Sequence, residues 1–135
     1  MVLLVEDDED DIGFFRRALS KTNSRARLAV ARDGDEAVAY LAGQGAFADR
    51  ERHPAPTHVI LDLKLPRRSG VEVLEWLRGE PALSRLPVAI LSSSNEPLDV
   101  ARARALGVDG YHVKPSGAAA LAETVRRVLD AWTLS

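Results

Sequence analysis

The chain of 135 residues contains no cysteine, which excludes disulfide bonds and thiolate metal sites. It also lacks any apolar run approaching the ~18 residues that a membrane-spanning helix needs. Its apolar start, Met1–Val5, runs directly into acidic residues, unlike a signal peptide. The net charge is only −2 and the basic residues are scattered, so neither nucleic acid nor an anionic membrane is an expected partner. We therefore expect a cytoplasmic protein.

The composition predicts one folded domain. Hydrophobic residues make up 46% of the chain and charged residues 28%, a balance that suits a sizeable core rather than disorder. The length is usual for one domain, and no repeat or linker is visible. The last helical pattern ends about where the chain does, so we expect a single domain over residues 1–135 without an output domain.

Short apolar runs alternate with amphipathic segments along the chain. The predicted strands are Leu3–Val5, Leu28–Val30, Val59–Leu61, Val88–Leu91 and Tyr111–Val113. Several are unbroken apolar runs, as in strands that are buried on both faces of a parallel sheet. Because parallel strands need crossover helices, the pattern predicts an α/β fold, a doubly wound five-stranded parallel sheet with helices on both faces. The segment Gly43–Pro56 is expected to be an extended surface loop.

Polar residues follow the predicted strands at the edge where such sheets bind ligands. Glu6 and Asp7 follow the first strand, Asp62 the third, Ser92 the fourth and Lys114 the fifth. A hard cation such as Mg²⁺ relieves the repulsion between clustered carboxylates, and a lysine and a hydroxyl can bind phosphoryl oxygens. Asp62 is the best candidate for a carboxylate nucleophile that accepts a phosphoryl group.

Four motifs together resemble the response-regulator receiver domains of two-component signalling. They are LLVEDD at Leu3–Asp8, VILDLKLPRRSG at Val59–Gly70, LPVAILSSS at Leu86–Ser94 and GYHVKP at Gly110–Pro115. Each motif alone would be weak, but the four stand in the family's order over essentially the whole chain. The VEDD start and the loop at residues 43–56 also resemble the small receivers that are paired with phytochrome-type photoreceptor kinases.

The resemblance implies a magnesium site around a phosphoacceptor. Asp62 would accept the phosphoryl group. Asp7, Asp62 and the backbone carbonyl of Lys64 would bind Mg²⁺, and Glu6 would act through a metal-bound water.

The resemblance also implies residues that bind the phosphoryl group and respond to it. Ser92 and Lys114 would contact the group, and the small Ser93 would leave access to it. Tyr111 would be the switch residue whose ring moves inward when Ser92 moves. The peptide bond before Pro115 would be cis, which an X–Pro bond tolerates at a cost of about 0.5–1 kcal/mol.

The partners implied by the resemblance are a sensor histidine kinase, such as a bacteriophytochrome, or a phosphotransfer protein, together with a downstream protein target. The output surface would be formed by residues 97–106, 111–113 and 118–132. Leu129, Trp132 and Leu134 are more apolar than a chain end needs, so we expect this surface to form a homodimer. Asp8, Glu9, Asp10 and Asp11 are expected to be a solvated helix start.

Three other functions remain open on the sequence alone. An aspartate-nucleophile phosphohydrolase of the haloacid dehalogenase type would need a second Asp where Lys64 stands. A flavodoxin-like cofactor binder would want a phosphate-binding loop after the first strand, where this chain has acids. A docking module that does not depend on phosphorylation would not need the complete set of acids, hydroxyl and lysine. The receiver reading predicts no enzymatic activity beyond the protein's own phosphorylation and dephosphorylation.

Overall fold

The computed structural model describes residues 1–21 and 27–132. One parallel sheet has the strand order β2-β1-β3-β4-β5. Its strands are β1 (Val2–Val5), β2 (Leu28–Ala31), β3 (His58–Leu61), β4 (Val88–Ser92) and β5 (Gly110–Val113). The helices are α1 (Glu9–Lys21), α2 (Gly34–Ala42), α3 (Gly70–Gly79), α4 (Pro97–Ala105) and α5 (Ala118–Ala131). The predicted doubly wound α/β fold is confirmed.

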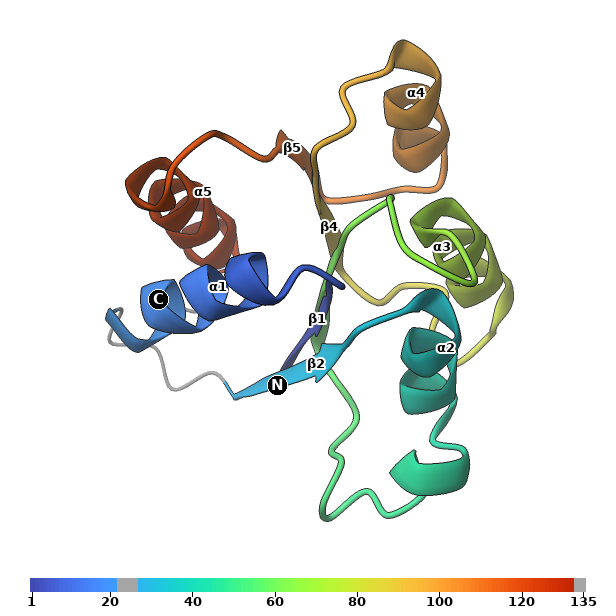
Figure 1. Ribbon diagram of the computed structural model, residues 1–135. Coiled ribbons are helices and arrows are strands. Elements are labelled where there is room, and N and C mark those ends of the chain that lie inside the picture. The colour runs from blue at the N-terminus through green and yellow to red at the C-terminus, as the bar shows by residue number, and fades with distance from the viewer. Residues whose placement is uncertain (22–26, 133–135) are drawn as a thin grey trace.

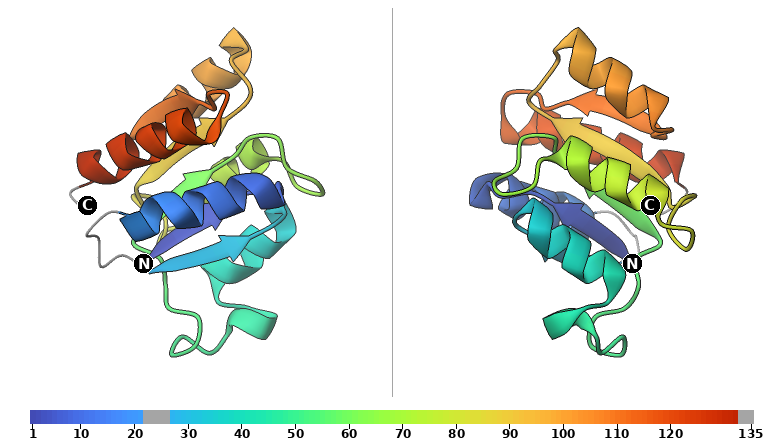
Figure 2. Two further views of the ribbon diagram at one scale, coloured as in Figure 1. Left: turned by 60° about the vertical axis from the view of Figure 1, so that its left-hand side comes forward. Right: turned by 90° about the vertical axis from the view of Figure 1, so that its right-hand side faces the viewer.

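The sheet lies between two helical layers. Helices α1 and α5 pack together on one face, and α2, α3 and α4 cover the other (Figures 1 and 2). Each layer encloses its own apolar cluster, with Phe15 and Leu129 in one and Leu74 and Leu77 in the other. Strand β1 is buried along its whole length, which explains why its sequence is an unbroken apolar run. None of the described helices is long and apolar enough to span a membrane.

Local signals start the helices close to the strand ends. The Oδ1 atom of Asp8 accepts hydrogen bonds from the backbone N–H groups of Asp10, at 2.9 Å, and Asp11, at 3.2 Å, which satisfies two free donors of the first turn of α1. Ser69 and Glu72 form a reciprocal capping box at the start of α3. These caps keep the loops at the carboxyl edge of the sheet short.

Two glycines hold the β3–α3 loop against its neighbours. A Cβ atom at Gly34 would lie 1.9 Å from the carbonyl oxygen of Arg68, and one at Gly70 would lie 2.2 Å from that of Asp62. Only glycine allows these backbone approaches. In the same loop Arg67 has a positive φ of 67°, and its guanidinium lies 3.6 Å from Asp33. The loop that follows Asp62 is therefore tied to the start of α2.

The segment at residues 43–56 is a mostly exposed loop before β3, as predicted, but it folds back on α2 rather than running free. It contains a 3-10 turn, η1 (Gly45–Phe47), seen beyond the end of α2 in Figure 1. The ring of Tyr40 lies 4.9 Å from that of Phe47 and 6.0 Å from that of His53, between centroids. Arg50 donates a hydrogen bond of 3.0 Å to the Leu41 carbonyl. Aromatic packing gives the segment a small core that composition alone did not indicate.

The end of α5 does not present the apolar surface that was expected from the sequence. Leu129 is fully buried, and the half-buried Trp132 packs on the same core cluster. The Trp132 ring lies 4.6 Å from the ring of His58, and its Nε1 atom donates a 3.0 Å hydrogen bond to Asp109. Leu134 lies outside the described residues. The interpretation of Leu129 and Trp132 as surface residues is therefore wrong, because both complete the intramolecular core.

Candidate functional site

Parallel pairing gathers the predicted site residues at one edge of the sheet. Val5 pairs with Leu61, and Ser92 pairs with Val113. The residues that follow β1, β3 and β5, together with the last residue of β4, consequently meet at the carboxyl edge. The side chains brought together there are those of Glu6, Asp7, Asp62, Ser92 and Lys114.

Three carboxylates form the acidic part of this site. Glu6, Asp7 and Asp62 each offer a carboxylate oxygen, and the three atoms lie within 4.8 Å of one another. Glu6 and Asp62 are only 3% exposed, whereas Asp7 is exposed. Oxygen donors, a concentration of negative charge and one side open to solvent fit a hard divalent cation that keeps several waters.

The Asp62 carboxylate is held by contacts at both oxygens. Its Oδ1 atom accepts hydrogen bonds from the Ser92 hydroxyl at 2.8 Å and from the Lys64 backbone N–H at 3.0 Å. Its Oδ2 atom accepts one from the Lys114 ammonium at 2.9 Å. The hydroxyl and the ammonium therefore already touch the carboxylate to which a phosphoryl group would be attached.

Lys114 is surrounded by acids. Its Nζ atom lies 2.6 Å from Glu6 Oε2, 2.9 Å from Asp11 Oδ2 and 2.9 Å from Asp62 Oδ2. Burial alone would lower the pKa of Lys114, but hydrogen bonds to the three carboxylates outweigh it and raise the pKa above its usual value. The ammonium is therefore charged throughout the physiological pH range.

Glu6 is the carboxylate whose protonation the site changes most clearly. Burial raises its pKa to about 7, although the hydrogen bonds from Lys114 and from the Asp8 backbone work in the opposite direction. The nearby charge of Asp62 adds to the increase. Without a cation, this edge of the sheet holds more negative charge than Lys114 alone offsets.

A chain of hydrogen bonds leads from the site to α4 and β5. The Ser94 backbone N–H donates to the Ser92 hydroxyl at 3.3 Å, and the Tyr111 hydroxyl donates to the Ser94 carbonyl at 2.6 Å. The Ser94 hydroxyl donates to Asp99 in the first turn of α4 at 2.5 Å. Ser93, between them, is exposed. A displacement of Ser92 would thus disturb the hydrogen bonds that Ser94 makes with Tyr111 and with Asp99 at the start of α4.

The predicted cis bond before Pro115 is wrong. No peptide bond in residues 1–21 or 27–132 is cis, so Lys114 and Pro115 are joined by a trans bond. The trans form is the intrinsically preferred one even for X–Pro. The Lys114 side chain reaches its three carboxylates from this backbone, so nothing at the site requires the other isomer.

Sequence reasoning missed two acidic residues that take part in the network. Asp11 was assigned to the solvated start of a helix, but it contacts Lys114. Asp99 was not singled out, although it binds Ser94. The sequence signal for both is the same: each lies in the first turn of a helix that starts at the carboxyl edge of the sheet.

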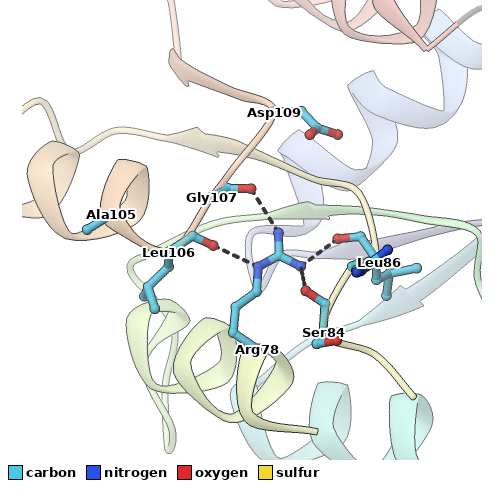
Figure 3. A pocket seen from close by; sticks show the side chains of 8 residues that line it. Arg78, Ser84, Leu86, Ala105, Leu106, Gly107 and Asp109 are labelled. Carbon is cyan, nitrogen blue, oxygen red and sulfur yellow. Dashed lines mark hydrogen bonds between the residues drawn. The ribbon is translucent and has the colours of Figure 1, made fainter. Parts of the chain in front are cut away.

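A separate hollow of about 420 Å³ lies near the opposite edge of the sheet, and Arg78 lines it. Its guanidinium donates hydrogen bonds to four backbone carbonyls, those of Leu106, Ser84, Leu86 and Gly107, at 2.7 to 3.1 Å (Figure 3). These bonds join the end of α3 to the segments that precede β4 and β5. Because its four acceptors are backbone carbonyls, Arg78 has a structural role in this hollow.

Comparison with known proteins agrees with this geometry. A family model described as response regulator receiver domain matches residues 2–126. The chain belongs to this family. It is 33% identical to the response regulator Rcp1 of a Synechocystis strain over 132 aligned residues. The alignment covers 98% of this chain and 88% of Rcp1. Membership in the receiver family favours this reading over the phosphohydrolase and flavodoxin-like alternatives.

Two solved structures extend the likeness to the fold. The phosphorylated cyanobacterial phytochrome response regulator RcpA is 33% identical, with a TM-score of 0.91 over 98% of this chain and 92% of RcpA. The Mn²⁺-bound form of Rcp1 is 34% identical, with a TM-score of 0.89 over 97% of this chain and 92% of that one. This chain is therefore a receiver domain similar to phytochrome response regulators, and a relative binds a divalent metal.

Proposed function

We propose that the protein is a phosphorylation-dependent response regulator in which Asp62 accepts the phosphoryl group. The observation that carries this proposal is the arrangement around Asp62. One carboxylate oxygen is bonded to the Ser92 hydroxyl and the other to the Lys114 ammonium, and Glu6 and Asp7 lie beside it. Hydroxyl and ammonium groups in these positions are suited to bind the oxygens of a phosphoryl group on Asp62.

The proposed cofactor is Mg²⁺. Asp7, Asp62 and the backbone carbonyl of Lys64 would be its protein ligands, and Glu6 would act through a bound water. Mg²⁺ would neutralise charge on the phosphoryl oxygens. The carboxylate-rich oxygen donor set of the site supports this assignment over a soft transition metal.

In the proposed reaction an oxygen of Asp62 forms a bond to phosphorus as the bond between phosphorus and the donor breaks. With a phosphohistidine donor, the leaving group is the histidine nitrogen. Lys114 and Ser92 would offset charge on the transferred oxygens. Ser93 is exposed and small, so it leaves room for the donor and, later, for the water that hydrolyses the acyl phosphate. This self-reaction is the only chemistry we propose for the protein.

The proposed partners are a sensor histidine kinase or a phosphotransfer protein, and a downstream protein target. Similarity to Rcp1 and RcpA supports a phytochrome-type kinase as the donor. We do not propose nucleic acid or a membrane as a partner, and a cytoplasmic location stays a prediction. The kinase would approach Asp62 from the exposed edge of the site, near Asp7 and Ser93.

The proposed output surface is the face formed by α4, β5 and α5, because Tyr111 and Ser94 connect it to Ser92. Leu98 on α4 is 61% exposed and Val113 on β5 is 45% exposed, and both are large apolar side chains. We propose that these two residues, rather than Trp132, contribute to a symmetric homodimer and to contacts with the target. Displacement of Ser92 and Tyr111 would shift this face between states that already exist.

Intact mass after incubation with acetyl phosphate and Mg²⁺ tests the main proposal. The wild type should gain one phosphoryl group, which is lost on standing as the acyl phosphate hydrolyses. Asp62→Asn should gain none, and omission of Mg²⁺ should prevent the gain. A phosphoryl group that persists in Asp62→Asn would assign the acceptor to another residue.

Sedimentation velocity tests the homodimer. The double variant with Leu98→Ser and Val113→Thr should be monomeric under conditions in which the wild type is a dimer with acetyl phosphate and Mg²⁺ present. A wild type that stays monomeric at high concentration in both phosphorylation states would leave the face to a heterologous partner.

A further inference from the structure

Asp11 joins the first helix to the residue that follows the last strand. It is the third residue of α1, and its Oδ2 atom lies 2.9 Å from the Nζ atom of Lys114. The Asp11 side chain is 27% exposed and that of Lys114 is 14% exposed. An ion pair in this partly shielded position is weakened less by solvent than one on the open surface.

The Lys114 ammonium has three carboxylate neighbours, as many as it has N–H donors. An ammonium offers three donors, and the three short contacts are to Glu6, Asp62 and Asp11. Glu6 and Asp62 also belong to the group of carboxylates whose oxygens lie close enough to hold one metal ion. Asp11 does not belong to that group. Among the described residues, it is therefore the one carboxylate partner of the Lys114 ammonium outside the candidate metal site.

A divalent cation at the site would weaken the other two contacts. It would share the negative charge of Glu6 and Asp62, and it would repel the ammonium by Coulomb's law. The attraction between Asp11 and Lys114 would be the least affected, because Asp11 contributes no ligand atom. Asp11 is itself anchored, since its backbone N–H donates to the Asp8 side chain in the cap of α1.

We propose that Asp11 is a positioning residue for phosphoryl transfer, which holds the Lys114 ammonium beside Asp62 while a divalent cation is bound. The inference rests on the proposed phosphorylation of Asp62. Asp11 does not draw the ammonium away from the acceptor, because Nζ lies at the same 2.9 Å from Asp11 and from Asp62. Asp11 thus keeps the Lys114 ammonium beside Asp62, where it can contact an oxygen of the incoming phosphoryl group.

The test compares phosphorylation rates at saturating Mg²⁺ with acetyl phosphate as the donor. Asp11→Asn has nearly the same shape as the wild type but lacks the charge, and it should be phosphorylated about threefold to tenfold more slowly. Asp11→Glu restores a carboxylate and should recover most of the rate. The Mg²⁺ dissociation constant of Asp11→Asn, from fluorescence titration, should stay within about twofold of the wild type.

The matched control is Asp10→Asn. Asp10 is the preceding residue of the same helical turn, is exposed and has no ion pair with Lys114 in the described structure. Its variant makes the same charge change and should keep the wild-type rate. An equal loss in Asp10→Asn would point to general charge rather than positioning and would overturn the proposal.

The remaining outcomes are also decisive. An Asp11→Asn rate equal to or faster than the wild type would overturn the positioning role, as would an Asp11→Glu rate no better than that of Asp11→Asn. A failure of the proposed function looks different. In that case the wild type gains no phosphoryl group, or Asp62→Asn gains one as readily.

Discussion

Two half-buried cations, Lys114 and Arg78, lie at opposite edges of the same sheet, and their partners differ in charge. Lys114 contacts three carboxylates at the carboxyl edge, and Arg78 contacts four neutral backbone carbonyls near the amino edge (Figure 3). The pKa of Lys114 is raised by its acidic partners, whereas burial lowers that of Arg78. Both residues are partly buried, so the charge of their partners explains why their pKa values shift in opposite directions.

The difference indicates two roles. The Arg78 guanidinium donates to four backbone carbonyls at once, so it joins three chain segments in one fixed arrangement. The carboxylates around Lys114 carry excess negative charge, so a divalent cation and a phosphoryl group can rearrange the contacts without leaving buried charge unpaired. One edge is built for stability and the other for exchange of partners.

Removal of Arg78 should have the largest effect on stability. Arg78→Ala leaves four partly buried carbonyls without their donor and should lower the free energy of unfolding by about 3 kcal/mol, measured by urea denaturation. Arg78→Lys should recover less than half of this loss, because a single ammonium cannot span the carbonyls as the planar guanidinium does. The folded fraction should be phosphorylated at the wild-type rate. A loss below about 1 kcal/mol would show that water replaces the guanidinium.

Removal of Lys114 should affect the reaction instead. Lys114→Ala should leave Mg²⁺ binding near normal but slow phosphorylation by acetyl phosphate about tenfold or more, since a charge-assisted contact to the transferred group is lost. Lys21→Ala, at the exposed end of α1, is the matched control and should keep the wild-type rate. An unchanged phosphorylation rate in Lys114→Ala would contradict a role of Lys114 in the reaction.

The pH dependence of stability should report the burial of the Glu6 carboxyl group at the carboxyl edge. Glu6 has a pKa of about 7 in the folded protein, above its ordinary value of 4.5, so the folded state binds the proton more tightly than the unfolded state. The metal-free protein should therefore lose stability, on the order of 1–2 kcal/mol, as the pH rises from about 5 to about 8.

Urea denaturation in the presence of a chelator, across that pH range, measures this loss. Glu6→Gln cannot ionise and should remove most of the dependence. Equal slopes for the wild type and Glu6→Gln would place the titrating group elsewhere.

The smallest effect is expected at Trp132. Trp132→Phe keeps an aromatic ring against His58 but loses the hydrogen bond to Asp109, and it should cost about 0.5–1 kcal/mol in thermal unfolding. Sedimentation of the variant should match that of the wild type, because the ring packs within its own chain. A change in oligomeric state would return Trp132 to the surface role that its sequence position first suggested.

The strand-end residues were predictable because topology alone brings them together. Once Val59–Leu61 and Leu3–Val5 are read as neighbouring parallel strands, Asp62 must lie beside Glu6 and Asp7. The same logic places Lys114 after the fifth strand. Such predictions need only the period of the apolar pattern and the rule that parallel strands end at one edge.

The remaining contacts depend on packing that periodicity does not encode. Whether Asp11 faces solvent or Lys114 depends on the rotation of α1 where it packs against α5. The burial of Trp132 depends on how far α5 extends past the edge of the sheet toward His58. The close approach at Gly34 involves Arg68, a residue 34 positions later, and no local pattern indicates it. The isomer at Pro115 differs by too little energy for the sequence to decide.

The contacts of Lys114 have a consequence for the order in which the protein becomes competent during synthesis. Lys114 lies 103 residues from Asp11 and 52 residues from Asp62. A nascent chain that has emerged only through Asp62 already carries the four acids of the site, Glu6, Asp7, Asp11 and Asp62, but it lacks the ammonium that contacts three of them. During synthesis Asp62 thus emerges well before Lys114, the residue that offsets its charge. We therefore expect a kinase to phosphorylate the incomplete chain poorly.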